Sequence, residues 1–164
     1  SEMCIRDRAK SEWLDKETGL LVSFLSEDGI PFKAAPVKGS YSALNCLYLT
    51  QIDSVFAREQ YHRLKSHFLQ SGLLFGIREY HDYSCWLGFD IDAGPVLFNL
   101  SPSGTAFAVG SATYFNDVRV RNNFLRTAEI AGHSVMWNNT RHYLLAEIAL
   151  VGECIMLAMR TTTP

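Results

Sequence analysis

The chain has 164 residues, 48% of them hydrophobic, and a formal net charge of −2, so it can bury a core and lacks the composition of a disordered protein. Its 15 basic residues are dispersed among 17 acidic ones, which disfavours nucleic-acid binding through a basic patch. The four cysteines form no C-x-x-C pair, so they indicate neither a zinc site nor a disulfide framework.

The start of the chain, residues 1–8, looks like translated sequencing-adapter read-through and is left out of the fold prediction. We expect these residues to pack against nothing. If the gene begins upstream, residues 9–160 are the C-terminal part of one domain, followed by a tail at 161–164. Localisation then stays open between cytoplasm and periplasm.

Five segments combine helical periodicity with capping residues and predict an all-α fold. Asp53 and Asp117 each precede a helix with one apolar stripe, whereas the other three helices are apolar on most sides. Long loops join the helices, with short extended pieces at 73–75 and 96–98. The expected helices cover residues 42–51, 54–70, 103–115, 118–131 and 142–160.

The most apolar run, residues 143–159, contains Glu147 and Glu153. Each acid would cost on the order of a few kcal/mol in lipid, so the run predicts a buried helix of a soluble protein and not a membrane span. An acid in a buried helix must be paired or functional. Glu147, near the start of the helix, is therefore a pocket candidate.

The sequence is organised around residues 88–107, where a loop with two carboxylates leads into a helix of small residues. Asp90 and Asp92 lie in the loop, and Ser101-Pro102 is typical of an N-cap followed by proline at the first helical position. The unpaired N–H groups and partial positive charge of that helix start suit a polar or anionic ligand.

Buried and amphipathic helices alternate along the chain, which predicts helical hairpins stacked in two layers. This pattern, with the runs Asp90-Ile-Asp-Ala-Gly-Pro and Ser101-Pro-Ser-Gly-Thr-Ala-Phe, resembles the (α/α) toroid or six-hairpin class. Within it the chain resembles uncharacterised bacterial proteins akin to the linalool dehydratase/isomerase group. A toroid of this class has about twelve helices, so the resemblance implies a partial toroid whose upstream hairpins are missing.

In such toroids the active site lies where the loops before the inner helices converge, here residues 36–42, 76–101 and 136–142. Aromatic and carboxylate side chains together suit a pocket for a sugar or an isoprenoid. No catalytic residue of the linalool enzyme is carried over. The resemblance and the pocket argument give as substrate-binding candidates Tyr41, Tyr83, Trp86, Asn99, Ser103, Trp137, Arg141, His142 and Glu147.

Asp90 and Asp92 are candidates for a general acid and base, because two close carboxylates in a partly dry pocket split their pKa values. Alternatively, one caps a turn and the other pairs with an arginine such as Arg78. A divalent metal is a lesser option, since Asp-x-Asp supplies only two hard ligands. We therefore expect no metal and no cofactor.

Three consecutive residues, Glu79, Tyr80 and His81, are further catalytic candidates, because they bring an acid, a phenol and an imidazole together for proton transfer. The alternative is a solvated surface loop.

The leading hypothesis is an enzyme that performs acid–base chemistry of the lyase, isomerase or hydrolase type on a small alcohol, terpenoid or carbohydrate. The alternatives are a non-catalytic toroid that binds a glycan, lipid or peptide, and a structural helical-repeat scaffold. The expected partner is a small molecule, without nucleic acid and without a membrane span.

Overall fold

The computed structural model describes residues 2–32, 35–91, 93–132, 134–143 and 150–162. The helices are α1 (Glu2–Glu12), α2 (Gly39–Leu49), α3 (Ser54–Phe68), α4 (Pro102–Tyr114), α5 (Val118–Gly132) and α6 (Leu150–Arg160). The strands are β1 (Leu69–Gln70), β2 (Gly76–Ile77), β3 (Leu87–Asp90), β4 (Gly94–Leu97), β5 (Ser134–Trp137) and β6 (Thr140–Tyr143).

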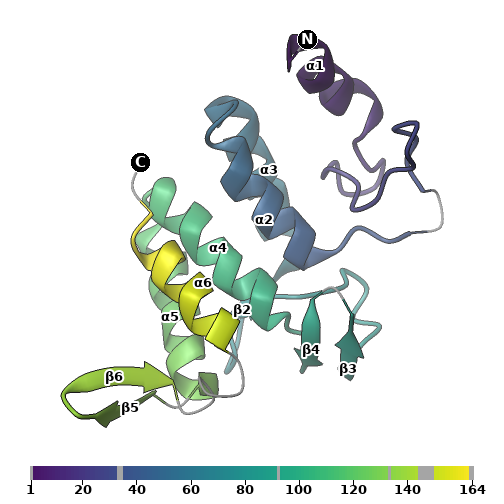
Figure 1. Cartoon of the computed structure of the whole chain (residues 1–164). Helices are drawn as coiled ribbons and strands as arrows, with labels where there is room; N and C mark the ends of the chain where they lie inside the picture. The colour runs from purple at the N-terminus through teal and green to yellow at the C-terminus, as the bar shows by residue number, and fades with distance from the viewer. Residues whose placement is uncertain (1, 33–34, 92, 133, 144–149, 163–164) are drawn as a thin grey trace.

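The core forms where α2 and α4 pack together, with α3 against α2 and with α5 and α6 against α4 (Figure 1). Small side chains let the two central helices approach closely. A Cβ atom on Gly104 would lie 3.0 Å from the Ser40 Cα, so the start of α4 sits directly against the start of α2. Large side chains such as Phe68 and Phe124 are fully buried around this contact.

The prediction of an all-α fold is wrong, because the described chain mixes helices with three antiparallel two-stranded ladders. These are β1–β2, β3–β4 and β5–β6, and none exceeds four residues per strand. Strands this short show too few alternations to register as a period of two. The turn between β5 and β6 uses left-handed backbone at Asn138 and Asn139, with φ of 47° and 64°, which asparagine tolerates better than most residues.

Four of the five predicted helices are confirmed within a few residues, as α2, α3, α4 and α5. The fifth, predicted over 142–160, is wrong at its beginning. Residues 140–143 pair as β6 with β5, and the described part of α6 is Leu150–Arg160. The apolar character of this stretch suits either a helix or a short strand, so composition alone did not separate them.

The predicted difference in burial is confirmed for the two central helices. Within α2 and α4 almost every side chain is buried or half-buried, whereas α3 and α5 each have one exposed face. The described end of α6 departs from the prediction, because Leu157 is 67% exposed.

Residues 2–12 form helix α1, so much of the segment left out of the fold prediction has regular structure. Ile5 is 61% exposed, but the expectation that residues 1–8 pack against nothing is not met at Arg8. Arg8 lies over the Trp13 ring, with its guanidinium carbon 5.6 Å from the ring centroid. Lys10 forms an ion pair with Asp53 at 2.7 Å.

In the part of the chain that the structure describes, no helix combines the length and the apolar character needed to cross a bilayer.

The N-cap of α3 gives a test of the capping argument. The Asp53 side chain accepts a hydrogen bond from the Phe56 N–H at 3.0 Å. Removing the cap by Asp53→Ala should cost about 1 kcal/mol and lower the melting temperature by about 2–4 °C. Asp53→Ser retains a capping oxygen but loses the ion pair with Lys10. Calorimetry should therefore find the serine variant close to wild type, and equal losses would attribute the effect to the ion pair.

Candidate functional site

Asp90, at the end of β3, forms hydrogen bonds with Lys38, with Tyr80 and with the turn that follows β3. Both its carboxylate oxygens accept hydrogen bonds from the Lys38 ammonium, at 3.0 and 2.8 Å. The Tyr80 hydroxyl donates to Asp90 Oδ2 at 2.7 Å, and the Ala93 N–H donates to Oδ1 at 3.2 Å. Asp90 thus caps a turn and pairs with a cation, but its partner is Lys38 and not Arg78.

Lys38 immediately precedes α2 and is largely removed from solvent. The side chains of Lys38 and Asp90 are 10% and 9% exposed, so the ion pair is screened little by water. The ammonium lies 5.4 Å from the ring centroid of Phe24 and 6.0 Å from that of Tyr41, a geometry in which aromatic faces attract a cation. Tyr41, a predicted binding residue, therefore belongs to this cluster.

Glu79 is fully buried between the starts of α2 and α4. The Ser40 hydroxyl donates to its Oε1 at 2.9 Å, and among the described residues Oε2 has no hydrogen-bond partner. Burial raises the pKa of this carboxyl above its usual value. The nearby hydroxyls of Ser101 and Ser40 oppose the rise, and the negative charge of Asp90 adds to it. The site thus holds a carboxyl group biased toward its neutral form.

The backbone around Glu79 is fixed on both sides. Its carbonyl accepts from the Gly39 N–H at 2.9 Å, and its N–H donates to the Asn99 carbonyl at 3.0 Å. A Cβ atom on Gly39 would lie 1.8 Å from the Arg78 carbonyl oxygen, so only glycine permits this approach. Asn99, a predicted binding residue, is 6% exposed and acts here through its backbone.

Tyr80 connects the cluster to an open cavity. Burial, followed by the hydrogen bond to Asp90, raises the Tyr80 pKa to about 12, so the phenol keeps its proton at neutral pH. The cavity has a volume of about 390 Å³. It is lined by Asp15, Glu17, Thr18, Ala35, Pro36, Val37, Phe68, Tyr80, His81, Asp82 and Ser84.

His81 lines the same cavity and is oriented by a carboxylate. Its Nε2 lies 2.9 Å from Glu17 Oε1, and the His81 side chain is 37% exposed. Two neighbouring residues, Tyr80 and His81, thus each contact a carboxylate, from Asp90 ten residues later and from the distant Glu17. The sequence identified both, but it gave no sign of Glu17.

The other predicted binding residues separate into two groups. Ser103 lies by the cluster, where its hydroxyl donates to the Ala93 carbonyl at 2.9 Å. Tyr83 and Trp86 are 58% and 64% exposed and do not line the cavity. The Arg78 guanidinium stacks on the Tyr83 ring at 3.9 Å, which gives this tyrosine a structural contact.

The predicted convergence of the 136–142 loop with the other two loops is not what the fold shows. Trp137, Arg141 and His142 lie on the β5–β6 hairpin. That hairpin projects beyond α5, on the other side of α4 from β3–β4 (Figure 1). Asp92 and Glu147 lie outside the described residues, so their roles stay predictions.

Sequence reasoning also missed Lys38 and Ser40. Lys38 occupies the N-cap position of α2 without a capping side chain, and a lysine there carries no recognisable signal. Its importance comes from Asp90, which is far away in sequence. Among the described residues, no group of three or more His, Cys, Asp or Glu side chains is arranged to hold a metal ion.

In comparisons with known proteins, neither a protein-family model nor a curated protein matches the chain.

The raised pKa of Glu79 predicts how stability varies with pH. The folded chain keeps this proton at pH values where the unfolded chain has lost it, so the contribution is complete below the ordinary pKa of 4.5 and decreases as pH rises through the folded pKa. Glu79→Gln mimics the neutral form at every pH. Relative to wild type, its melting temperature should rise as the pH increases above the ordinary pKa of 4.5. Glu27→Gln, at an exposed turn, is the control, and parallel curves for Glu79→Gln and wild type would contradict the assignment.

The buried ion pair predicts an asymmetric response to substitution. Asp90→Asn leaves the Lys38 ammonium without its carboxylate and should cost about 3–5 kcal/mol. The double variant Lys38→Met/Asp90→Asn removes both charges and should recover most of that loss, because methionine suits the aromatic surroundings of Lys38. Urea unfolding measures both variants. An additive loss in the double variant would show that the two groups do not interact.

Proposed function

We propose that this chain is part of an enzyme that performs acid–base chemistry on a small neutral or cationic molecule bound beside Tyr80 and His81. One observation carries the proposal. Two adjacent side chains that can carry protons line one cavity, and each is held by a carboxylate, Tyr80 by Asp90 and His81 by Glu17. Paired titratable groups at a cavity are the usual arrangement of an acid–base site.

His81 is suited to act as the general base. When its Nε2 carries the proton and donates to Glu17, Nδ1 is the basic nitrogen. A carboxylate in this position fixes the tautomer and stabilises the imidazolium formed after proton abstraction. His81 would then remove a proton from a hydroxyl or an activated C–H group of the substrate.

Tyr80 is suited to orient the substrate. Its proton is directed to Asp90, so the remaining lone pair on the phenol oxygen is able to accept a hydrogen bond from a substrate hydroxyl. Lys38 and Asp90 act behind Tyr80 as positioning residues. Glu79 does not line the cavity, and its role in this scheme is to complete the buried support.

The charge of the cavity narrows the substrate class. Asp15, Glu17 and Asp82 line it, and among the described residues no lysine or arginine does. A cleft with acidic walls repels anions and favours neutral or cationic ligands. Its polar lining supports a small alcohol or carbohydrate better than a terpenoid hydrocarbon. Isomerase, lyase and hydrolase reactions of such substrates all include a step in which a base removes a proton from the substrate or from water, and His81 would be that base.

The test is turnover of a panel of small alcohols and sugars, followed by proton NMR. With a substrate found, His81→Gln should lower kcat by about 10²–10⁴-fold with a much smaller change in KM, because the base acts in the transition state. Glu17→Gln should lower kcat in the same direction. The control is His62→Gln, which changes an exposed histidine on α3.

Binding distinguishes catalysis from mere capture of the ligand. Ligand affinity measured by calorimetry should survive in His81→Gln while turnover is lost. Wild-type turnover in that variant would refute the assigned base. Binding without any turnover in the wild type would make the cavity a recognition site.

A further inference from the structure

Gln60 is a polar side chain of the interior to which the proposed chemistry gives no role. It lies on α3 and is only 2% exposed. Its side-chain oxygen accepts a hydrogen bond from the Leu21 N–H at 2.9 Å, and its side-chain nitrogen donates to the Gly19 carbonyl at 2.9 Å. The side-chain amide thus binds the backbone of residues 19–21 as a neighbouring strand would, because it presents the same donor and acceptor as a peptide group.

The backbone bound in this way belongs to a short hairpin over residues 13–22. Leu14 and Leu21 pair as an antiparallel bridge. Gly19 closes the turn with a φ of 65°, a left-handed conformation that glycine adopts without strain. We call this segment the 13–22 hairpin.

The turn of the 13–22 hairpin carries Glu17 and is fixed internally by Asp15. Asp15 Oδ2 accepts hydrogen bonds from the N–H and the hydroxyl of Thr18, both at 2.8 Å, and from the Glu17 N–H at 3.2 Å. Thr18 is 4% exposed, so this side of the turn is packed. The backbone at Glu17 therefore takes its orientation from the turn as a whole.

Two contacts between the 13–22 hairpin and the rest of the chain differ in how they depend on direction. The Leu20 side chain is 1% exposed and packs in the core. This contact resists separation of the hairpin but allows it to rotate, because apolar burial is non-directional. The two hydrogen bonds of Gln60 depend on angle as well as on distance. Gln60 therefore fixes how the turn faces the cavity.

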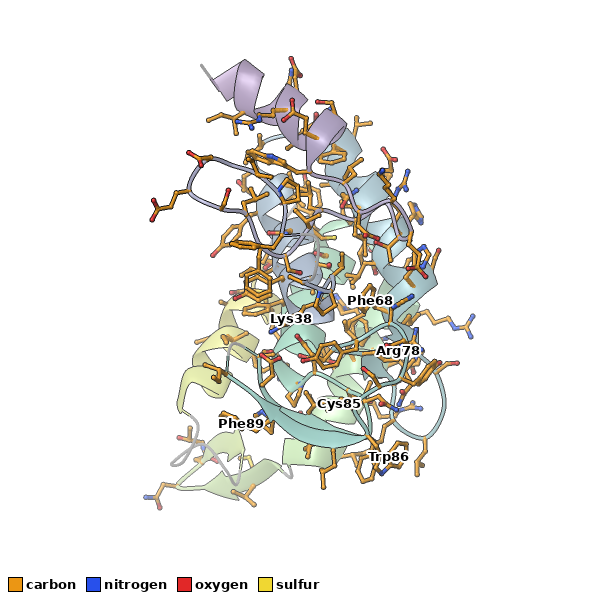
Figure 2. All side chains as sticks on the ribbon, turned by 90° about the vertical axis from the view of Figure 1, so that its right-hand side faces the viewer. Lys38, Phe68, Arg78, Cys85, Trp86 and Phe89 are labelled. Atoms are coloured by element: carbon orange, nitrogen blue, oxygen red, sulfur yellow. The ribbon has the colours of Figure 1, made fainter. Side chains whose placement is uncertain are left out.

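The helix that carries Gln60 also supports the opposite wall of the cavity. Phe68, the last residue of α3, lines the cavity, and its ring centroid lies 6.3 Å from that of His81. Its carbonyl accepts a hydrogen bond from the Arg78 N–H at 2.9 Å, and Figure 2 shows the labelled Phe68 and Arg78 close together near the middle of the molecule. One helix thus holds both the hairpin with Glu17 and the segment that leads to His81.

We propose that Gln60 is a positioning residue of the candidate site, which holds Glu17 within hydrogen-bonding distance of His81 by binding the backbone of the 13–22 hairpin. The effect on turnover rests on the proposed function, whereas the effect on the Glu17–His81 contact does not. The contact needs this support, because the Glu17 side chain is 72% exposed and exposed pairs contribute little by themselves. Gln60 does not line the cavity and acts only through Glu17.

The test is the NMR spectrum of the His81 ring, combined with amide hydrogen exchange. Gln60→Met is close to glutamine in size but loses both hydrogen bonds. The Leu21 amide should then exchange about 10-fold faster or more, and the His81 ring signals should move to the positions found in Glu17→Gln. Gln60→Asn, whose amide is one methylene shorter and does not reach both partners, repeats the test if Gln60→Met fails to fold.

The control is Val120→Ala, which removes buried apolar atoms on α5. Helix α5 lies on the other side of the molecule from the 13–22 hairpin (Figure 1). Loss of stability by itself should therefore leave the His81 ring signals in place.

Turnover provides a second measurement once a substrate is known. Gln60→Met should lower kcat as far as Glu17→Gln does, with a smaller change in KM. Adding Glu17→Gln to Gln60→Met should bring no further loss, because both substitutions remove the same contact with His81. A glutamine that only stabilises the fold would give additive losses.

His81 ring signals that move in Gln60→Met as they do in Glu17→Gln, and stay in place in Val120→Ala, support the proposal. Unchanged His81 signals in the folded Gln60 variants would overturn it, and so would additive losses of kcat. A wild type without any turnover would contradict the proposed function, and the NMR result would still decide whether Gln60 holds the Glu17–His81 contact.

Discussion

The ion pair between Lys38 and Asp90 is the interaction on which the arrangement of the site depends. It ties the start of α2 to the inner face of β3, across a part of the chain where both side chains are nearly removed from water. The same carboxylate accepts the Tyr80 proton, so one buried charge pair fixes a helix start, a hairpin and a phenol. Because a buried charge without its partner is costly, each group constrains the other two elements.

This constraint connects the interior of the hairpin with its surface. On the inside, Asp90 supports Tyr80 at the edge of a cavity that also holds the Glu17–His81 contact. On the outside, the pleat turns Leu87 and Phe89 toward solvent. The proposed chemistry and the exposed apolar side chains therefore lie on opposite faces of one short ladder.

The sequence determined the helices and their caps. Asp53, Ser101 and Asp117 each accept a backbone hydrogen bond from the first turn of the following helix, and local side-chain chemistry suffices to predict that. Burial of α2 and α4 on most sides also followed from their composition. Tyr80 and His81 were recognisable as proton-transfer candidates because adjacent titratable side chains are visible without a fold.

Tertiary structure decided the fold class and the partners of each titratable group. The ladders are too short for a period of two to be visible, and only pairing across β5–β6 made residues 140–143 a strand and not the start of a helix. Asp90 pairs with Lys38, and His81 contacts Glu17, across long separations in sequence. No local pattern encodes such pairs, because they form only when the fold brings distant segments together, and only the Lys38–Asp90 pair is then also removed from water.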